Sequence, residues 1–124
     1  MNRYVQVDVL KGKTLTKIDV SSDEIIFHAD DGSVYRMYHE QDCCESVYIE
    51  DINGDINDLI GTPILMAEEV ASYEAPPLDP DDATYGSYTW TFYKFATIKG
   101  YVTIRWYGTS NGYYSESVDF CQIV

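Results

Sequence analysis

The final third of the chain is dominated by aromatic and β-branched residues, and this pattern constrains the fold more than any other feature. Gly100 allows a sharp chain reversal, and Asn111-Gly112 is typical of a tight hairpin turn. Residues of these types favour the extended, pleated backbone of a sheet. The sequence therefore predicts antiparallel strands joined by tight turns. The dense segments are SYTWTFYKFATIK (87–99), YVTIRWYG (101–108) and YYSESVDFCQIV (113–124).

Alternation in the first of these segments divides its side chains between two faces, because successive residues of a strand point to opposite sides. We predict that the first of the two sets faces the core. The first set is Tyr88, Trp90, Phe92 and Lys94, and the second is Thr89, Thr91, Tyr93 and Phe95.

The N-terminal part also predicts strands. TLTKIDV (14–20) and EIIFHA (24–29) are rich in β-branched residues, and Asp31-Gly32 favours a tight turn into SVYRMYH (33–39). In that last segment Val34, Arg36 and Tyr38 alternate with Tyr35, Met37 and His39. SVYIEDI (46–52) begins as a further strand. The best-supported local element is thus a hairpin centred on Asp31-Gly32.

The middle of the chain is less regular. Asp55 can cap a single helical turn, INDLI, that Gly61 closes. ILMAEEVASY (64–73) fits either a strand or a helix, and we favour a strand. APPLDPDDATYG (75–86) contains three prolines and three aspartates, which predicts a loop rather than an element.

These segments amount to about seven strands and one short helical turn. We therefore expect a mostly β fold, either a small antiparallel sheet or a curled sandwich or half-barrel, with an α+β fold as the alternative. A chain of 124 residues is long enough to bury roughly two thirds of its unfolded surface. Without a repeat or a boundary in the sequence, residues 1–124 are expected to form a single domain.

The charge is strongly negative and unevenly placed. The chain has 21 acidic and 8 basic residues, a net charge of -13, and no Lys or Arg lies between Arg36 and Lys94. Like charges repel unless they are solvated or matched by a partner, so direct binding of a nucleic-acid backbone is excluded. The acids of this stretch are Glu40, Asp42, Glu45, Glu50, Asp51, Asp55, Asp58, Glu68, Glu69, Glu74, Asp79, Asp81 and Asp82.

The N-terminal residues MNRYVQVDVLKGK show no signal-peptide pattern, and no run of about 18 apolar residues could cross a bilayer. We expect a cytoplasmic protein without a membrane contact. Three cysteines cannot pair without leaving one thiol over, which suits a reducing compartment.

A calcium loop is the first metal site to test, because DINGDIND (51–58) places oxygen ligands at alternate positions. Its sixth position, where the bend requires glycine, is Ile56, and its twelfth, where an acid completes the shell, is Thr62. The reading as a polar turn and helix cap is therefore favoured. Soft ligands for zinc lack a chelating spacing, and we predict neither a metal nor a cofactor. These ligands are His28, His39, Cys43, Cys44 and Cys121.

No catalytic motif accompanies the serines and histidines: the chain lacks a nucleophile elbow, a phosphate loop and a zinc-protease helix. His39, Asp42 and Cys43 lie close in sequence, but such a trio arises often by chance, so no catalytic residue is predicted. Tyr107, Tyr113 and Tyr114 flank the predicted turn at residues 111–112 and resemble an interface, because tyrosine gives large contact area at low entropy cost. Ordinary strand packing explains them equally well.

Three motifs are distinctive in combination: D-C-C-E-S-V at Asp42 to Val47, I-E-D-I at Ile49 to Ile52, and L-I-G-x-P-I at Leu59 to Ile64. With HEQDCCESVYIEDINGDINDLIGTPILMAEE (39–69) and GYVTIRWYGTSNGYYSESV (100–118), the chain resembles a family of small uncharacterised proteins encoded by phages and prophages. The resemblance implies a viral accessory protein acting in a bacterial cytoplasm. It carries over no functional residue.

We therefore expect a non-enzymatic phage protein that binds and inhibits a basic, nucleic-acid-handling host protein, in the manner of anti-CRISPR or DNA-mimic proteins. Its carboxylates would replace phosphates in a channel lined by Lys and Arg. The predicted contact residues are Glu45, Glu50, Asp51, Asp55, Asp58, Asp79, Asp81, Asp82, Tyr107, Tyr113 and Tyr114.

Alternatives from other classes stay open. A module that binds a small ligand such as a nucleotide signal would need converging cations, and only eight bases exist. A virion or assembly component would form a symmetric homo-oligomer. The acidic surplus could also serve solubility alone.

Overall fold

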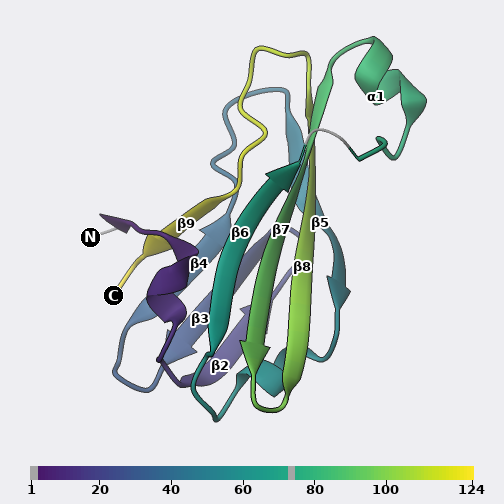
Figure 1. The fold of residues 1–124 in the computed structure, drawn as a ribbon. Helices are drawn as coiled ribbons and strands as arrows, with labels where there is room; N and C mark the ends of the chain where they lie inside the picture. Colours follow the sequence, from purple (N-terminus) through teal and green to yellow (C-terminus); the bar gives the residue numbers. More distant parts are fainter. Residues whose placement is uncertain (1–2, 73–74) are drawn as a thin grey trace.

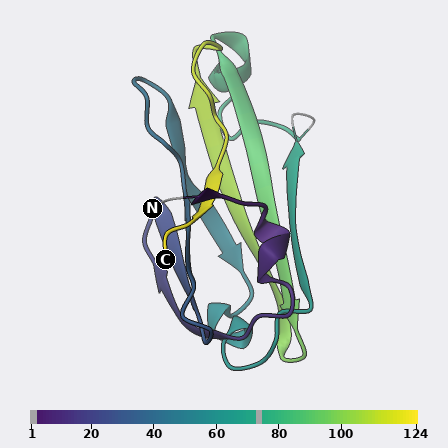
Figure 2. The same ribbon diagram turned by 90° about the vertical axis from the view of Figure 1, so that its left-hand side faces the viewer.

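Two antiparallel sheets pack face to face in the computed structural model, which describes residues 3–72 and 75–124 (Figures 1 and 2). The mostly β prediction is confirmed, and the two layers form a sandwich. The five-stranded sheet has the order β1 (Arg3–Tyr4), β9 (Asp119–Gln122), β4 (Val34–Tyr38), β3 (Glu24–Ala29) and β2 (Leu15–Val20). The four-stranded sheet has the order β5 (Ser46–Asn53), β8 (Gly100–Ser110), β7 (Ser87–Thr97) and β6 (Met66–Ser72).

The described residues hold nine strands rather than the seven expected, in part because β1 has only two residues and leaves no pattern in the sequence. The ambiguous segment 64–73 contains β6, so the choice of strand is confirmed. Tyr73, its last residue, and Glu74 lie outside the described residues.

The helical elements of the described residues are three single turns. The predicted one is a 3-10 turn, η2 (Ile56–Leu59), and the Asp55 side chain caps it by accepting from the Asn57 N–H at 3.0 Å. The turns η1 (Val7–Leu10) and α1 (Pro80–Thr84) were not predicted. The prediction that 75–86 forms a loop without a helix or strand is therefore wrong in part. Pro80 begins α1, and proline is well suited to the first position of a helix.

Two of the three predicted reversals are hairpins. Gly32 adopts a φ of 88° between β3 and β4, a conformation that glycine alone adopts without strain. The β7–β8 hairpin closes at the pair Thr97 and Gly100. The third prediction is wrong, because the connection 111–118 leads out of one sheet and into the other, where β9 pairs with β4 and β1.

The core lies between the sheets, and it corrects the faces assigned to 87–96. Tyr93 and Phe95 point inward, and the Phe95 ring lies 5.8 Å from that of Phe27 on the opposite sheet. Trp90, predicted to face the core, lies on the outer face instead. Both faces carry aromatic residues, so hydrophobicity alone could not choose between them. In β4 the predicted alternation is confirmed, with Tyr35 and Met37 buried in the core.

None of the helices in the described part of the chain has the length and apolar character needed to cross a membrane.

Candidate functional site

Three connections meet at one end of the sandwich, which we call the loop end: residues 39–45, 75–86 and 111–118 (Figure 1). Hydrogen bonds join the first connection to the third and to β9. The His39 Nδ1 donates to the Ser117 carbonyl at 2.7 Å, and the Glu40 N–H donates to the Asp119 carboxylate at 3.0 Å. These contacts fix the loop 39–45 against the connection that carries Tyr113 and Tyr114.

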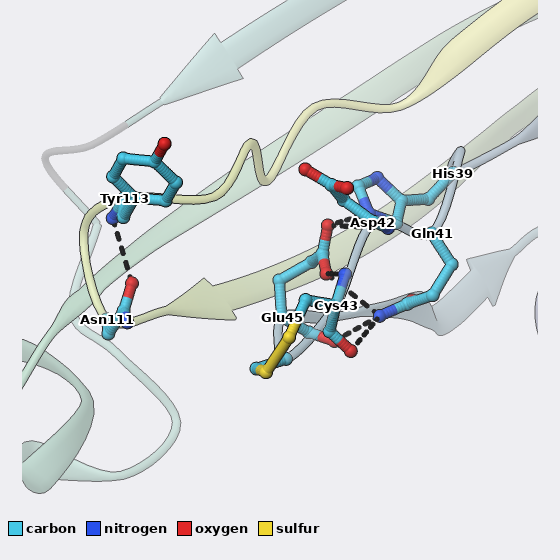
Figure 3. The surroundings of a disulfide bond; sticks show 8 residues. His39, Gln41, Asp42, Cys43, Glu45, Asn111 and Tyr113 are labelled. Carbon is cyan, nitrogen blue, oxygen red and sulfur yellow. Dashed lines mark hydrogen bonds and ion pairs between the residues drawn. A yellow bond between two sulfur atoms is a disulfide. The ribbon is translucent and has the colours of Figure 1, made fainter.

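Glu45 lies at the centre of the first loop with its side chain fully buried (Figure 3). Its carboxylate accepts from the Cys43 N–H at 2.9 Å, the Asp42 N–H at 3.2 Å, the Gln41 amide at 2.9 Å and the His39 ring at 3.0 Å. Sequence reasoning placed Glu45 among the partner-binding acids. The structure contradicts that expectation, because the carboxylate is turned inward to satisfy loop N–H groups.

The electrostatics of Glu45 follow from these contacts. Burial raises the pKa of a carboxyl group, and hydrogen bonds to its ionised form lower it. In Glu45 the bonds from main-chain N–H groups and from His39 outweigh burial and lower the pKa to about 2. Glu45 is therefore a fixed negative charge that organises the loop.

The adjacent Cys43 and Cys44 form a disulfide at the tip of this loop (Figure 3), while Cys121 is a buried free thiol. The odd thiol is as expected, but the reduced state inferred from the cysteine count is not what the structure shows. The number of cysteines could not predict a disulfide between adjacent residues, because it carries no information about the local backbone conformation.

The acids of α1 are held at the second connection. The Asp79 side chain caps the helix by accepting from the Asp81 N–H at 2.9 Å, and no residue of α1 is buried. Tyr107 anchors the segment: its hydroxyl donates to Asp82 at 2.5 Å and accepts from the Leu78 N–H at 3.1 Å. Burial and the hydrogen bond to Asp82 raise the pKa of Tyr107, so it remains a neutral donor. Tyr107 itself is buried and offers no contact area to a partner.

The same segment covers aromatic side chains on the outer face of the four-stranded sheet. The Trp90 indole N–H donates to the Pro76 carbonyl at 3.0 Å, and the Trp90 ring lies 4.5 Å from that of Tyr107. The Tyr88 hydroxyl donates to the Ala75 carbonyl at 2.7 Å. This cover explains why these aromatic residues can lie outside the core.

Tyr113 and Tyr114 lie on the third connection, with their rings edge to face at 5.0 Å. Tyr113 is 83% exposed, and Tyr85 beside α1 is 80% exposed. A cavity of about 220 Å³ lies between α1 and the end of β8 and is lined by Cys44, Asp81 and Tyr85 among others. The loop end thus combines exposed tyrosines with the acids of α1 and with the disulfide loop.

The remaining predicted acids lie elsewhere. Glu50 and Asp51 on β5 approach Arg105, at 2.5 and 3.7 Å. Asp55 caps η2, and the Asp58 carbonyl accepts from Thr97 at the far end of β7. Because β7 has 11 residues, its two ends lie roughly 33 Å apart. The fold therefore separates acids that share one stretch of the sequence. Some lie at the loop end, Glu50 and Asp51 lie beside Arg105 in the middle of β8, and the others lie at the far end of β7.

Sequence reasoning missed a polar cluster inside the sandwich, in which Glu116 accepts from Thr89 at 2.8 Å and from Ser110 at 2.5 Å. The signal was present as Ser87, Thr89 and Thr91 at alternate positions of one strand. The sequence prediction placed the opposite face of this strand toward the core, so it gave no reason to expect a polar cluster here. Within the described residues, no group of three or more His, Cys, Asp or Glu is arranged to hold a metal ion.

Comparison with known proteins gives a family and nothing further. No curated protein and no solved structure matches the chain. The family described as "Domain of unknown function (DUF7448)" matches residues 8–120, which include every strand except the two-residue β1 and the last two residues of β9. The sandwich and its loop end therefore lie almost entirely within a recognised domain, and the chain belongs to the DUF7448 family.

Proposed function

We propose that this protein is a non-enzymatic binding protein whose loop end engages a basic surface of a nucleic-acid-handling host protein. In this proposal it acts as an acidic phage accessory protein in the bacterial cytoplasm, and its carboxylates occupy a site that otherwise holds phosphates. Blocking that site inhibits the host protein, as an anti-CRISPR protein or a DNA mimic does.

The observation that carries the proposal is the unpaired state of the acids. Among the described acids from Glu40 to Asp82, Glu50 and Asp51 alone form an ion pair with a Lys or Arg. Asp42, Asp79 and Asp81 at the loop end are exposed. Unpaired carboxylates attract a basic surface over long range and release its counterions on binding.

The neighbouring tyrosines support the choice of the loop end over the far end of β7. Tyr85 and Tyr113 are exposed on two of its connections, and tyrosine supplies apolar contact area and a hydroxyl at low entropy cost. The far end, around Asp55 and Asp58, also has one strongly exposed tyrosine, Tyr101, but there Lys99 lies among the acids and donates to the Ile60 carbonyl. The acids of the loop end have no such basic neighbour among the lining residues of their cavity.

Affinity capture tests the proposal. The immobilised protein is exposed to bacterial lysate, with and without nuclease, and bound proteins are identified. We expect a basic nucleic-acid-binding protein that is retained after nuclease treatment and released by salt. If nuclease abolishes all specific capture, or the captured proteins are acidic, the proposal is wrong.

A further inference from the structure

A second site lies between the two layers. A cavity of about 410 Å³ is bounded on one side by the inner faces of β6 and β7 and on the other by residues 114–118. In Figure 2 the yellow connection 111–118 runs alongside β7 and β8. Ser115 and Ser117 at its rim are exposed, so the cavity opens to solvent. Its volume is within the range of about 300–1,000 Å³ that ligand pockets occupy.

The lining is polar where a sandwich normally has apolar side chains. Thr91 is 4% exposed and lines the cavity, yet its hydroxyl makes no hydrogen bond within the described residues. The hydroxyl is not among the fully buried side-chain oxygens that lack a partner in the described residues, so it stays accessible from the cavity. It can therefore form a hydrogen bond with a molecule bound there.

Two carboxylates line the same cavity. Glu116 is fixed by hydroxyl donors, from Thr89 at 2.8 Å, from Ser110 at 2.5 Å and from Ser87. Glu69 accepts from the Tyr93 hydroxyl through Oε1, and burial together with this bond raises the pKa of Tyr93, so it stays a neutral donor. The second oxygen of Glu69 has no partner within the described chain.

All of these donors are neutral, and no Lys, Arg or His lines the cavity. Glu116 is half-buried and Glu69 is exposed at the rim, so two negative charges face one space that has no positively charged lining residue. Electrostatic interactions in such a partly enclosed space are stronger than in bulk water. A ligand that brings a positive charge and several N–H donors satisfies Glu69, Glu116 and Thr91 together.

We propose that this cavity binds an organic cation, an alkylammonium or guanidinium group. Glu69 and Glu116 accept its N–H groups, and the Thr91 hydroxyl provides a further polar contact. A metal ion is disfavoured because the described residues offer no cluster of three metal-binding side chains. The inference goes beyond the proposed loop-end interface and does not depend on it.

Binding is tested by NMR titration of the full chain with three small molecules. Agmatine carries both cationic groups, the blocked tripeptide acetyl-Gly-Lys-Gly-amide presents a lysine side chain as its one charge, and acetyl-Gly-norleucine-Gly-amide is its uncharged counterpart. We expect saturable shifts of the Thr89, Thr91 and Ser117 amides with the first two and none with the third. Binding of agmatine alone assigns a small free amine as the ligand, and binding of the peptide as well assigns a basic side chain of another protein.

Matched variants separate the cavity from general electrostatics. Glu69→Gln removes one cavity carboxylate, whereas Glu68→Gln removes the neighbouring charge on the outer face of the same strand. We expect Glu69→Gln and Thr91→Val each to weaken agmatine binding about tenfold, or ~1.4 kcal/mol, and Glu68→Gln to leave it unchanged. Unsaturable shifts, or equal weakening by Glu68→Gln and Glu69→Gln in folded protein, would overturn the assignment. Capture of a host partner at the loop end would be unaffected by either result.

Discussion

His39 and Glu45 are joined by a buried hydrogen bond, with Nε2 and Oε2 3.0 Å apart and side chains 4% and 0% exposed. The other ring nitrogen of His39 donates to Ser117, so this pair links the disulfide loop to the connection that carries Tyr113. Glu45 therefore supports the binding surface that we propose from within the loop, and its own carboxylate is not part of that surface.

Replacing Glu45 with Gln should destabilise the protein and reduce the dependence of its stability on acid pH. The folded pKa of about 2 lies below the ordinary 4.5, so the folded state binds fewer protons between these values and stability rises with pH there. The contribution of Glu45 is complete above about pH 4.5 and is lost as the pH falls towards 2. Urea denaturation at several pH values measures it.

The control is Glu40→Gln, which neutralises an exposed acid in the same loop. It should retain the wild-type dependence of the urea midpoint on pH between 2 and 4.5. If the Glu45 variant follows the same curve as wild type, the carboxylate does not organise the loop.

Tyr107→Phe should release the segment that carries α1. The substitution removes the hydroxyl that joins Leu78 to Asp82, and we expect a loss of about 1–3 kcal/mol in the free energy of unfolding. Limited proteolysis within 75–86 should also accelerate. Tyr101→Phe, at an exposed position, should stay within about 0.5 kcal/mol of wild type.

Asp79→Ala should loosen α1 itself. The Asp79 carboxylate caps the helix through the Asp81 N–H, and loss of such a cap costs about 1 kcal/mol. Hydrogen exchange at Asp82 and Tyr85 should accelerate roughly fivefold. Asp79→Asn retains a capping oxygen and should leave the exchange rates unchanged, and an equal effect of both substitutions would refute the role of the cap.

The faces of β7 can be tested by truncating one aromatic side chain on each. Phe95 is buried against Phe27, whereas Phe92 stacks on Trp90 at the outer face. Phe95→Ala should cost about 3–5 kcal/mol, and Phe92→Ala clearly less, as measured by chemical denaturation. If Phe92→Ala destabilised the protein more than Phe95→Ala, the faces predicted from the sequence would be correct and those of the structure wrong.

Local chemistry explains what the sequence could predict. The turn at Asp31-Gly32 and the cap at Asp55 depend on residues within a few positions of one another, and both were found. The hairpin at Asn111-Gly112 failed because β9 pairs with β4, and a pairing with so distant a strand leaves no trace near the turn.

The candidate site was harder to predict for the same reason. Glu45 carries a charge, which normally indicates exposure, and only the folded loop provides the N–H groups that permit its burial. Likewise, Asp55 and Asp79 belong to the same stretch without Lys or Arg but lie near opposite ends of β7. Sequence shows that the acids are numerous, and the fold decides which of them face one partner.

The most direct test of the loop-end interface compares two triple variants of equal charge change in their affinity for the captured host protein across a range of salt concentrations. Asp42, Asp79 and Asp81 are changed to Asn in one variant, and Asp51, Asp55 and Asp58 in the other. The first should bind at least about tenfold more weakly, or ~1.4 kcal/mol, with a shallower salt dependence. The second should bind like wild type. Wild-type affinity and salt dependence in the loop-end variant would contradict the account.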